Sequence, residues 1–160
     1  MFEIVLFEPE IPPNTGNIMR LCANAPARLH LVEPLGFRLD DKRLRRAGLD
    51  YRDQANVCRH ASLDACAEAL GPRRRWVTLT TRGERCYSDW AYSPGDVMVF
   101  GPETRGLPAA VLESFAPQTR LVIPQLPGSR SINLSNAVGI VLWEAWRQNA
   151  FSGQATRSRA

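Results

Sequence analysis

Short apolar runs alternate with amphipathic segments along most of the chain, and this alternation indicates the architecture. The apolar runs, which predict strands, are Glu3–Phe7, Arg28–Val32, Ala55–Arg59, Trp76–Thr80, Val97–Phe100 and Arg120–Ile123. The segments that predict helices are Gly16–Asn24, Asp41–Ala47, Leu63–Leu70, Pro108–Phe115 and Ala137–Gln148. Strands that alternate with helices predict an α/β fold with a mostly parallel sheet flanked by helices.

Polar residues mark the expected starts of three helices. Asn14 or Thr15 is expected to cap the first helix, after a proline-rich stretch that predicts a rigid loop. Ser62 is expected to cap the helix that follows it, and Ser135 with Asn136 the last helix. Residues 82–94 are polar and rich in turn residues, so they predict a connection without a strand of its own.

The length of 160 residues suits one compact domain, which we expect over residues 1–150, followed by a flexible tail over 151–160. No apolar run approaches the roughly 18–20 residues that cross a bilayer. The first eight residues lack the basic start of a signal peptide, and Glu8 interrupts their apolar run. These features predict a cytoplasmic protein with no membrane partner.

The spacing of the four cysteines does not match the pattern of a metal site. Cys22, Cys58, Cys66 and Cys86 form no C-x-x-C pair, and neither histidine lies near one of them in a ligand pattern. We therefore expect reduced thiols that pack in the fold, and no metal ion.

The charge balance permits a nucleic-acid partner without establishing one. Twenty basic and 16 acidic residues give a net charge of +4, and the basic side chains are almost all arginine. Arginine favours bidentate contacts with phosphate and stacking on bases. The basic residues cluster at 42–46 and at 73–75. A solvated surface explains either cluster equally well when it is taken alone.

Three loops that follow predicted strands are unusually rich in Pro, Gly, Asn, Ser, Glu and Arg. They span Glu8–Asn17, Gly101–Gly106 and Pro124–Asn136. Ligands of parallel sheets bind outside the carboxyl ends of the strands, where such loops converge. The clustering therefore predicts a ligand site made by all three loops.

The common catalytic motifs are missing from these loops. No G-x-G-x-x-G follows the first strand, and Leu107-Pro108 replaces the Lys-Ser/Thr pair that a P-loop requires after its second glycine. No G-x-S-x-G elbow is present either. Backbone amides, small polar side chains, a few arginines and Glu103 remain. Such a site suits group transfer from an activated donor, in which positioning lowers the barrier.

The residues of these loops also carry a resemblance to a known family. NTGNIMR at residues 14–20, FGPETRGLP at 100–108, and IP at 123–124 with SINLSNAV at 131–138 are similar to the three motifs of SPOUT-class RNA 2′-O-ribose methyltransferases. DDKRLRRAGLDY at 40–51 and EAWRQ at 144–148 extend the similarity toward the small members that modify tRNA. The resemblance covers roughly residues 1–150.

The resemblance implies an activity, a cofactor and an assembly. The expected reaction is methyl transfer from S-adenosyl-L-methionine to the ribose 2′-OH of a cytidine or uridine at position 34 of tRNA, the wobble nucleotide. The product would be S-adenosyl-L-homocysteine. The implied fold contains a C-terminal trefoil knot, and the implied assembly is a homodimer that binds the tRNA anticodon stem-loop and no DNA.

The resemblance, together with the chemistry of the individual side chains, indicates three groups of site residues. The cofactor-binding residues are Leu79, Gly101, Ile123 and Ser131. The catalytic candidates are Arg20, Asn17, Glu103 and Asn133. The candidate RNA contacts are Arg43, Arg45, Arg46 and Arg130. Since a guanidinium stays protonated, Arg20 is expected to hold phosphate and ribose rather than act as a base.

Two other functions are compatible with the same residues. The first is a methyltransferase that acts on another tRNA position or on ribosomal RNA. The second is a protein of this fold that binds RNA or cofactor without turnover. Intact motifs argue against the second function, and the lack of a separate RNA-binding domain argues weakly against the first.

Overall fold

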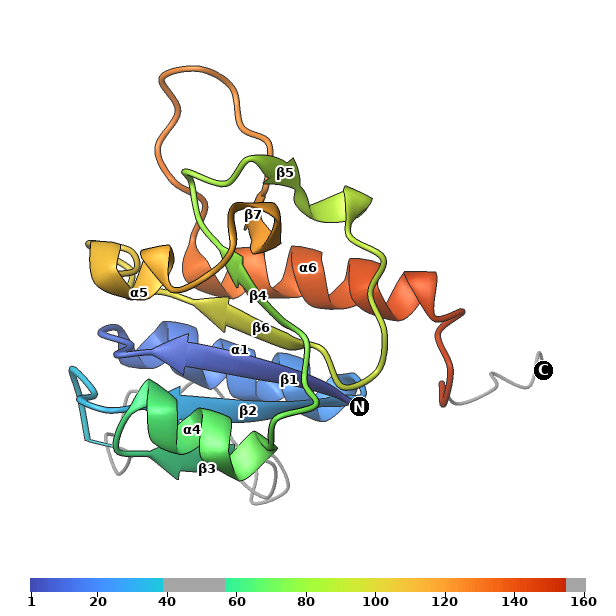
Figure 1. Ribbon diagram of the computed structural model, residues 1–160, viewed down its shortest axis with the longest axis horizontal. Coiled ribbons are helices and arrows are strands. Elements are labelled where there is room, and N and C mark those ends of the chain that lie inside the picture. The colour runs from blue at the N-terminus through green and yellow to red at the C-terminus, as the bar shows by residue number, and fades with distance from the viewer. Residues whose placement is uncertain (39–56, 155–160) are drawn as a thin grey trace.

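A seven-stranded parallel sheet forms the centre of the protein in the computed structural model, which describes residues 1–38 and 57–154 (Figure 1). Its strand order is β3-β2-β1-β6-β4-β7-β5. The strands are β1 (Phe2–Phe7), β2 (Ala27–Val32), β3 (Val57–His60), β4 (Trp76–Leu79), β5 (Arg85–Cys86), β6 (Val97–Phe100) and β7 (Arg120–Val122). Every neighbouring pair of these strands is parallel, as the sequence predicts.

Helices cover both faces of the sheet, which explains the continuous apolar character of its central strands. Ile4 and Leu6 of β1 point into a core shared with α1 (Pro12–Asn24) and α6 (Leu134–Gln148). Val5 and Phe7 alternate to the opposite face and meet α4 (Leu63–Leu70) and α5 (Ala109–Glu113). The result is a three-layer α/β arrangement.

Helix α1 begins four residues earlier than the sequence predicts. Pro12 and Pro13 occupy its first turn, where an absent backbone N–H breaks no helical hydrogen bond. The N-cap is Ile11, which provides no capping side chain, so the prediction of Asn14 or Thr15 as the cap is wrong. Both residues lie buried inside the helix instead.

Helix α6 also begins early, at Leu134, and Asn133 caps it. The Asn133 side chain accepts a hydrogen bond of 2.9 Å from the backbone N–H of Ser135. The prediction that Ser135 and Asn136 cap the helix is therefore wrong. The predicted cap of α4 is confirmed, because Ser62 Oγ accepts a hydrogen bond from Ala65 N–H at 3.1 Å.

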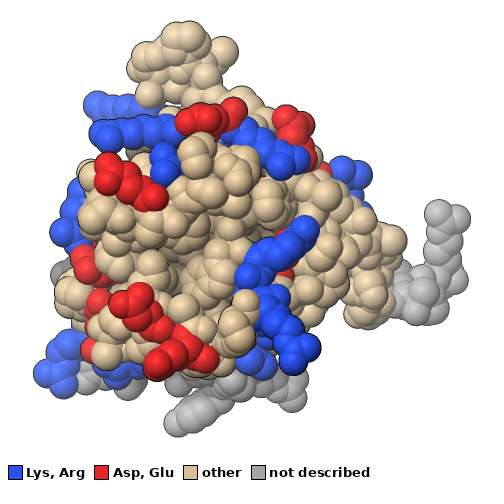
Figure 2. Space-filling model, in the orientation of Figure 1, with Lys and Arg blue, Asp and Glu red and all other residues tan. Residues whose placement is uncertain are grey.

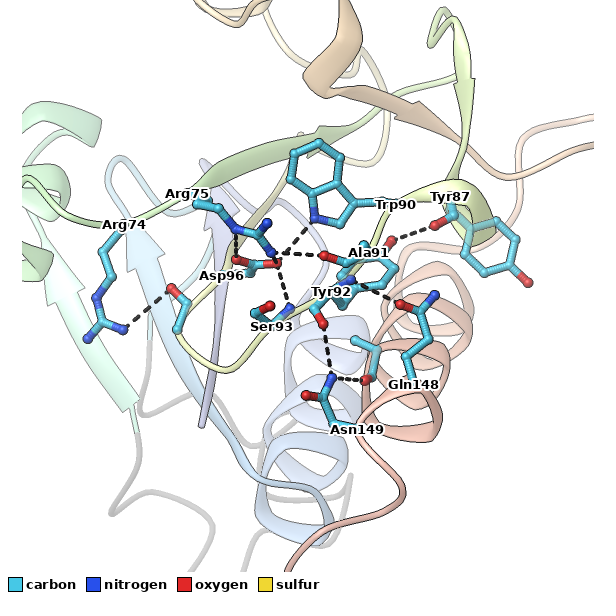
Figure 3. Close-up of polar contacts among 12 residues, drawn as sticks. Arg74, Arg75, Tyr87, Trp90, Ala91, Tyr92, Ser93, Asp96, Gln148 and Asn149 are labelled. Carbon is cyan, nitrogen blue, oxygen red and sulfur yellow. Dashed lines mark hydrogen bonds and ion pairs between the residues drawn. The ribbon is translucent and has the colours of Figure 1, made fainter.

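The connection over residues 82–94 contains an unpredicted two-residue strand, β5, and a 3₁₀ turn, η1 (Tyr87–Asp89). The buried carboxylate of Asp96 holds the end of this connection in place. It accepts hydrogen bonds from Arg75 at 2.8 and 2.6 Å and from Trp90 Nε1 at 3.1 Å (Figure 3). The guanidinium groups of Arg75 and Arg85 both lie 5.2 Å from the Trp90 ring centroid. These contacts hold the connection against the sheet edge.

Some sequence predictions fall on residues 39–56 and 155–160, outside the described residues. They are the helix Asp41–Ala47, the candidate RNA contacts Arg43, Arg45 and Arg46, and most of the tail predicted over residues 151–160. Within residues 1–38 and 57–154, no helix is long and apolar enough to cross a membrane.

Candidate functional site

A cavity of about 490 Å³ lies at the carboxyl ends of β4, β6 and β7. The three strands are parallel, so their C-terminal loops reach the same edge of the sheet. Residues that follow each strand line the cavity, and Asn14 of α1 lies at its margin. This is the region that the sequence predicts as the ligand site.

All four predicted cofactor-binding residues line this cavity. They are Leu79, Gly101, Ile123 and Ser131. Leu79 and Ile123 provide apolar walls, and Ser131 is an exposed polar residue on the loop before α6. A Cβ atom added to Gly101 would lie 2.4 Å from the backbone N of Leu107, so only glycine permits this loop to fold back so tightly.

The carboxylate of Glu103 joins the second loop to the start of α1. Glu103 Oε2 accepts a hydrogen bond from Glu10 N–H at 2.8 Å, and Oε1 accepts from Ile11 N–H at 3.2 Å and from Asn14 Nδ2 at 3.1 Å. A carboxylate at this position also interacts favourably with the positive end of the helix dipole. It compensates for the missing side-chain cap of α1.

Asn14 extends this network to the third loop. Its Oδ1 accepts a hydrogen bond of 3.0 Å from Asn133 Nδ2, and Asn133 Oδ1 accepts in turn from Ser135 Oγ at 2.7 Å. Asn14 is buried, so its amide depends on these partners. A continuous hydrogen-bonded chain therefore crosses all three sequence motifs.

A second set of contacts holds the tip of the Gly101–Gly106 loop against the loop that follows β1. Glu10 Oε2 accepts hydrogen bonds from Thr104 Oγ1 at 2.6 Å and from Thr104 N–H at 3.1 Å. These bonds, with a smaller effect from Arg105, lower the pKa of the Glu10 carboxyl below its ordinary value. Arg105 forms ion pairs with Glu8 and with Glu10.

Comparison with known proteins identifies the family. The model of the SpoU rRNA Methylase family matches residues 1–143, which is most of the chain. The chain belongs to the SpoU rRNA Methylase family.

Two relatives of this SpoU methylase are similar over nearly their whole length, and a third over about half of its length. A tRNA (cytidine(34)-2′-O)-methyltransferase from Saccharophagus degradans is 58% identical over 153 residues, which are 96% of this chain and 99% of the relative. A solved structure described as giving insights into the 2-OH methylation of C/U34 on tRNA is 42% identical with a TM-score of 0.88, and the match covers 94% of this chain and 97% of that chain. An AdoMet-bound rRNA methyltransferase from Sinorhizobium meliloti is 25% identical with a TM-score of 0.79, over 91% of this chain and 56% of that chain.

The predicted catalytic residues of this SpoU methylase occupy two different settings. Glu103 and Asn133 line the cavity and belong to the hydrogen-bonded chain. Asn17 and Arg20 are exposed residues of α1 outside the cavity lining. The candidate RNA contact Arg130 is exposed on the loop before α6.

Asn14 is a residue of this network that the sequence-based prediction did not include among the site residues. It lies within the first motif of the SpoU methylase, but its side chain joins Glu103 to Asn133. One signal was available: Asn14 precedes Ile18 by four residues and so shares its buried helix face. A buried amide on an apolar face requires hydrogen-bond partners, which marks such a residue for a specific role.

Proposed function

We propose that this SpoU methylase transfers a methyl group from S-adenosyl-L-methionine to the ribose 2′-OH of the wobble nucleotide of tRNA, a cytidine or uridine at position 34. One observation carries the proposal: the hydrogen-bonded chain from Glu103 through Asn14 to Asn133 joins the three motifs around one cavity. The name of the Saccharophagus degradans relative and the description of the solved structure that is 42% identical agree in reaction and in target nucleotide.

The cavity suits the proposed cofactor in size and lining. Its volume of about 490 Å³ lies within the range of roughly 300–1,000 Å³ that is typical of small-molecule sites. Leu79 and Ile123 would enclose the adenosine with apolar surface, while Gly101 lets the backbone approach it closely and Ser131 offers a hydroxyl. When bound, the cofactor supplies a methyl group already activated on a sulfonium centre.

The protein then has to align the ribose 2′-oxygen with that methyl group and exclude water. A guanidinium group offers several donors and no acceptor, so we assign Arg20 to holding the phosphate or ribose of the target, with Asn17 as a neighbouring polar contact. Asn133 borders the cavity and is fixed by Asn14. Glu103 already accepts three hydrogen bonds, which favours a positioning role over that of a general base.

Arginine side chains would bind the RNA backbone. Arg130 lies on the loop that follows β7, beside Ser131 of the cavity lining, and we assign it to phosphate contact together with Arg43, Arg45 and Arg46. Figure 2 shows basic and acidic side chains interspersed over the described part of the face that it draws. Local contacts to an anticodon stem-loop fit this pattern better than binding to long duplexes.

A homodimer is part of the proposal, with α1 and α6 as its interface. These helices pack together on one face of the sheet and leave Ile11 40% and Ile140 37% exposed. Val141 and Leu142, in contrast, are fully buried in the protomer's own core. A second copy would cover the exposed apolar residues and complete the groove for the substrate.

Three further properties complete the proposal. We expect one methyltransferase domain over residues 1–150, a trefoil knot formed by its C-terminal part, and a cytoplasmic location where tRNA is available. The close return of the Gly101–Gly106 loop and the network at Asn133 are compatible with the tight loop path of a knot.

An RNA assay tests this function. Purified protein is incubated with methyl-labelled S-adenosyl-L-methionine and either bulk tRNA or ribosomal RNA from cells that lack the enzyme. The proposal expects label in tRNA only, recovered in 2′-O-methylated nucleosides. Label in ribosomal RNA, or binding of S-adenosyl-L-homocysteine without any transfer beside an active control enzyme, would contradict it.

A further inference from the structure

Two histidines and a cysteine meet on the sheet face that α4 covers, away from the cavity. His30 of β2 and His60 of β3 are brought together by parallel pairing of their strands, and Cys66 of α4 packs above them. The three potential ligand atoms lie within 4.8 Å of one another. His30 Nδ1 and His60 Nε2 are 2.9 Å apart, and Cys66 is completely buried.

A buried carboxylate orients the central histidine of this cluster. Glu3 of β1 is 3% exposed, and its Oε2 lies 3.0 Å from His30 Nε2. Arg74 Nη2 lies 3.6 Å from the other carboxylate oxygen, so an ion pair holds the Glu3 side chain in place. When His30 carries its proton on Nε2, this N–H donates a hydrogen bond to Glu3. The lone pair on Nδ1 then faces His60 and Cys66.

We propose that His30, His60 and Cys66 form a binding site for Zn²⁺ or a related thiophilic divalent cation, with Glu3 as the carboxylate that positions His30. Two imidazole nitrogens and one thiolate are a donor set typical of zinc. A carboxylate on the second nitrogen of a ligating histidine is the usual outer partner at such centres.

The distances between the donors agree with this assignment. Tetrahedral zinc with Zn–N near 2.0–2.1 Å and Zn–S near 2.3 Å requires ligand atoms roughly 3.3–3.8 Å apart. The three atoms, all within 4.8 Å, need shifts of only a few tenths of an ångström up to about 1 Å to reach this geometry. His60 is only partly buried, which provides an entry path and leaves a fourth position for solvent.

The site would join β2, the edge strand β3 and α4, on the side of the sheet opposite to α1 and α6. None of its three ligands lines the cavity at β4, β6 and β7. The inference therefore stands apart from the methyl-transfer proposal. Loss of the metal is expected to loosen this edge of the sheet without removing cofactor binding.

Cobalt substitution tests the proposal on the full chain. Protein stripped with a chelator is titrated with Co²⁺, and the thiolate-to-cobalt charge-transfer band and the melting temperature are recorded. The wild type is expected to bind one equivalent, develop the band, melt at a higher temperature, and lose the band when one equivalent of Zn²⁺ is added.

Matched variants separate this site from adventitious binding. C66S and H60Q should each abolish the band and weaken Co²⁺ affinity at least tenfold, while C86S, on the opposite edge strand β5, should behave like the wild type. H60Q keeps the test decisive if C66S fails to fold, because His60 is partly exposed. The absence of a band in the wild type would overturn the proposal and leave only a hydrogen-bonded histidine pair. A band that survives H60Q would overturn it as well.

Discussion

Asn133 Nδ2 donates a hydrogen bond of 3.0 Å to Asn14 Oδ1, although the two residues are 119 positions apart in the chain. Asn14 Nδ2 in turn donates a hydrogen bond of 3.1 Å to Glu103 Oε1. Each residue comes from a different sequence motif, so one buried amide links all three motifs. This link makes specific predictions about which substitutions impair the site.

Replacing Asn14 with alanine should damage both stability and catalysis. The change leaves Asn133 Nδ2 and part of the Glu103 carboxylate without their partner, at an expected cost of about 1–3 kcal/mol in the free energy of unfolding. We expect kcat to fall more than KM rises, because geometry at the reacting centre is lost. Urea unfolding and steady-state kinetics measure the two effects. Asn24→Ala, on the exposed last turn of the same helix, is the control and should change neither quantity appreciably.

Replacing Glu103 with glutamine distinguishes a positioning role from a general-base role. The amide keeps one acceptor oxygen but loses the charge that stabilises the start of α1, so the free energy of unfolding should fall by about 1 kcal/mol. Catalysis should fall by less than a factor of ten, with the pH profile of kcat unchanged. A loss of several orders of magnitude together with loss of a pH-dependent limb would show that Glu103 is a base. Glu113→Gln in the exposed part of α5 controls for the loss of one charge.

The substitution Gly101→Ala tests the tight loop beside the cavity. Its added methyl group would lie 2.4 Å from Leu107 N and 2.7 Å from Gly106 C, so the backbone of the loop has to move. We expect S-adenosyl-L-homocysteine affinity, measured by calorimetry, to fall more than tenfold. Gly139→Ala is a matched change in α6, where the nearest atom is a Leu21 methyl at 3.6 Å. This control should bind normally and gain roughly 0.5–1 kcal/mol of stability from its helical position. Equal affinities in the two variants would contradict the assigned role of the loop.

Arg20 is expected to act through charge and geometry at the target nucleotide. Arg20→Ala should lower kcat/KM for tRNA by at least 100-fold and leave cofactor affinity unchanged. Arg20→Lys should recover part of the loss, because an ammonium keeps the charge but lacks the bidentate fork. Arg28→Ala removes an equal charge from an exposed position of β2 and should have little effect. A cofactor affinity that falls in parallel with kcat/KM would contradict this assignment.

Tyr92 should make the fold sensitive to alkali. Its hydroxyl donates to Tyr87 O at 2.9 Å, and burial, followed by nearby Glu144 and Asp96, raises the pKa of the Tyr92 phenol (Figure 3). Below pH 10 the phenol is neutral in both states, and its pKa has no effect on stability. Above pH 10 the unfolded chain ionises first, so the free energy of unfolding falls by up to about 1.4 kcal/mol per pH unit.

Chemical denaturation between pH 8 and pH 11 measures this slope. Tyr92→Phe should flatten it, at the expense of one hydrogen bond at neutral pH. Tyr87→Phe keeps the backbone carbonyl that Tyr92 uses, so the slope should remain. An identical slope in wild type and Tyr92→Phe would exclude Tyr92 as its source.

The central strands and the position of the site could be predicted from the sequence because local pattern determines both. β1 is buried on both faces, so its apolar run is continuous, and parallel pairing then places the loops at one edge. The four residues predicted to bind the cofactor lie at or beyond strand ends, and all four line the cavity. Their roles toward the cofactor remain predictions.

The features that escaped prediction depend on contacts between distant segments. In the sequence, Pro12 and Pro13 are typical of a loop. In the structure they begin α1, where Glu103 accepts a hydrogen bond from the backbone N–H at the helix start. Strand β5 has only two residues, and Asp96 and Trp90 hold its surroundings in place. His30 and His60 become neighbours only through the pairing of β2 with β3. The spacing of these two histidines along the chain does not indicate that they lie together in the fold.

The most direct test of the central claim is to map the methylated nucleotide. Unmodified tRNA is incubated with the protein and S-adenosyl-L-methionine, digested with nucleases, and the fragments are sequenced by mass spectrometry. The proposed function predicts one added methyl group on the ribose of nucleotide 34, and its disappearance with Arg20→Ala. A methyl group on any other nucleotide, or on a base instead of a ribose, would contradict it.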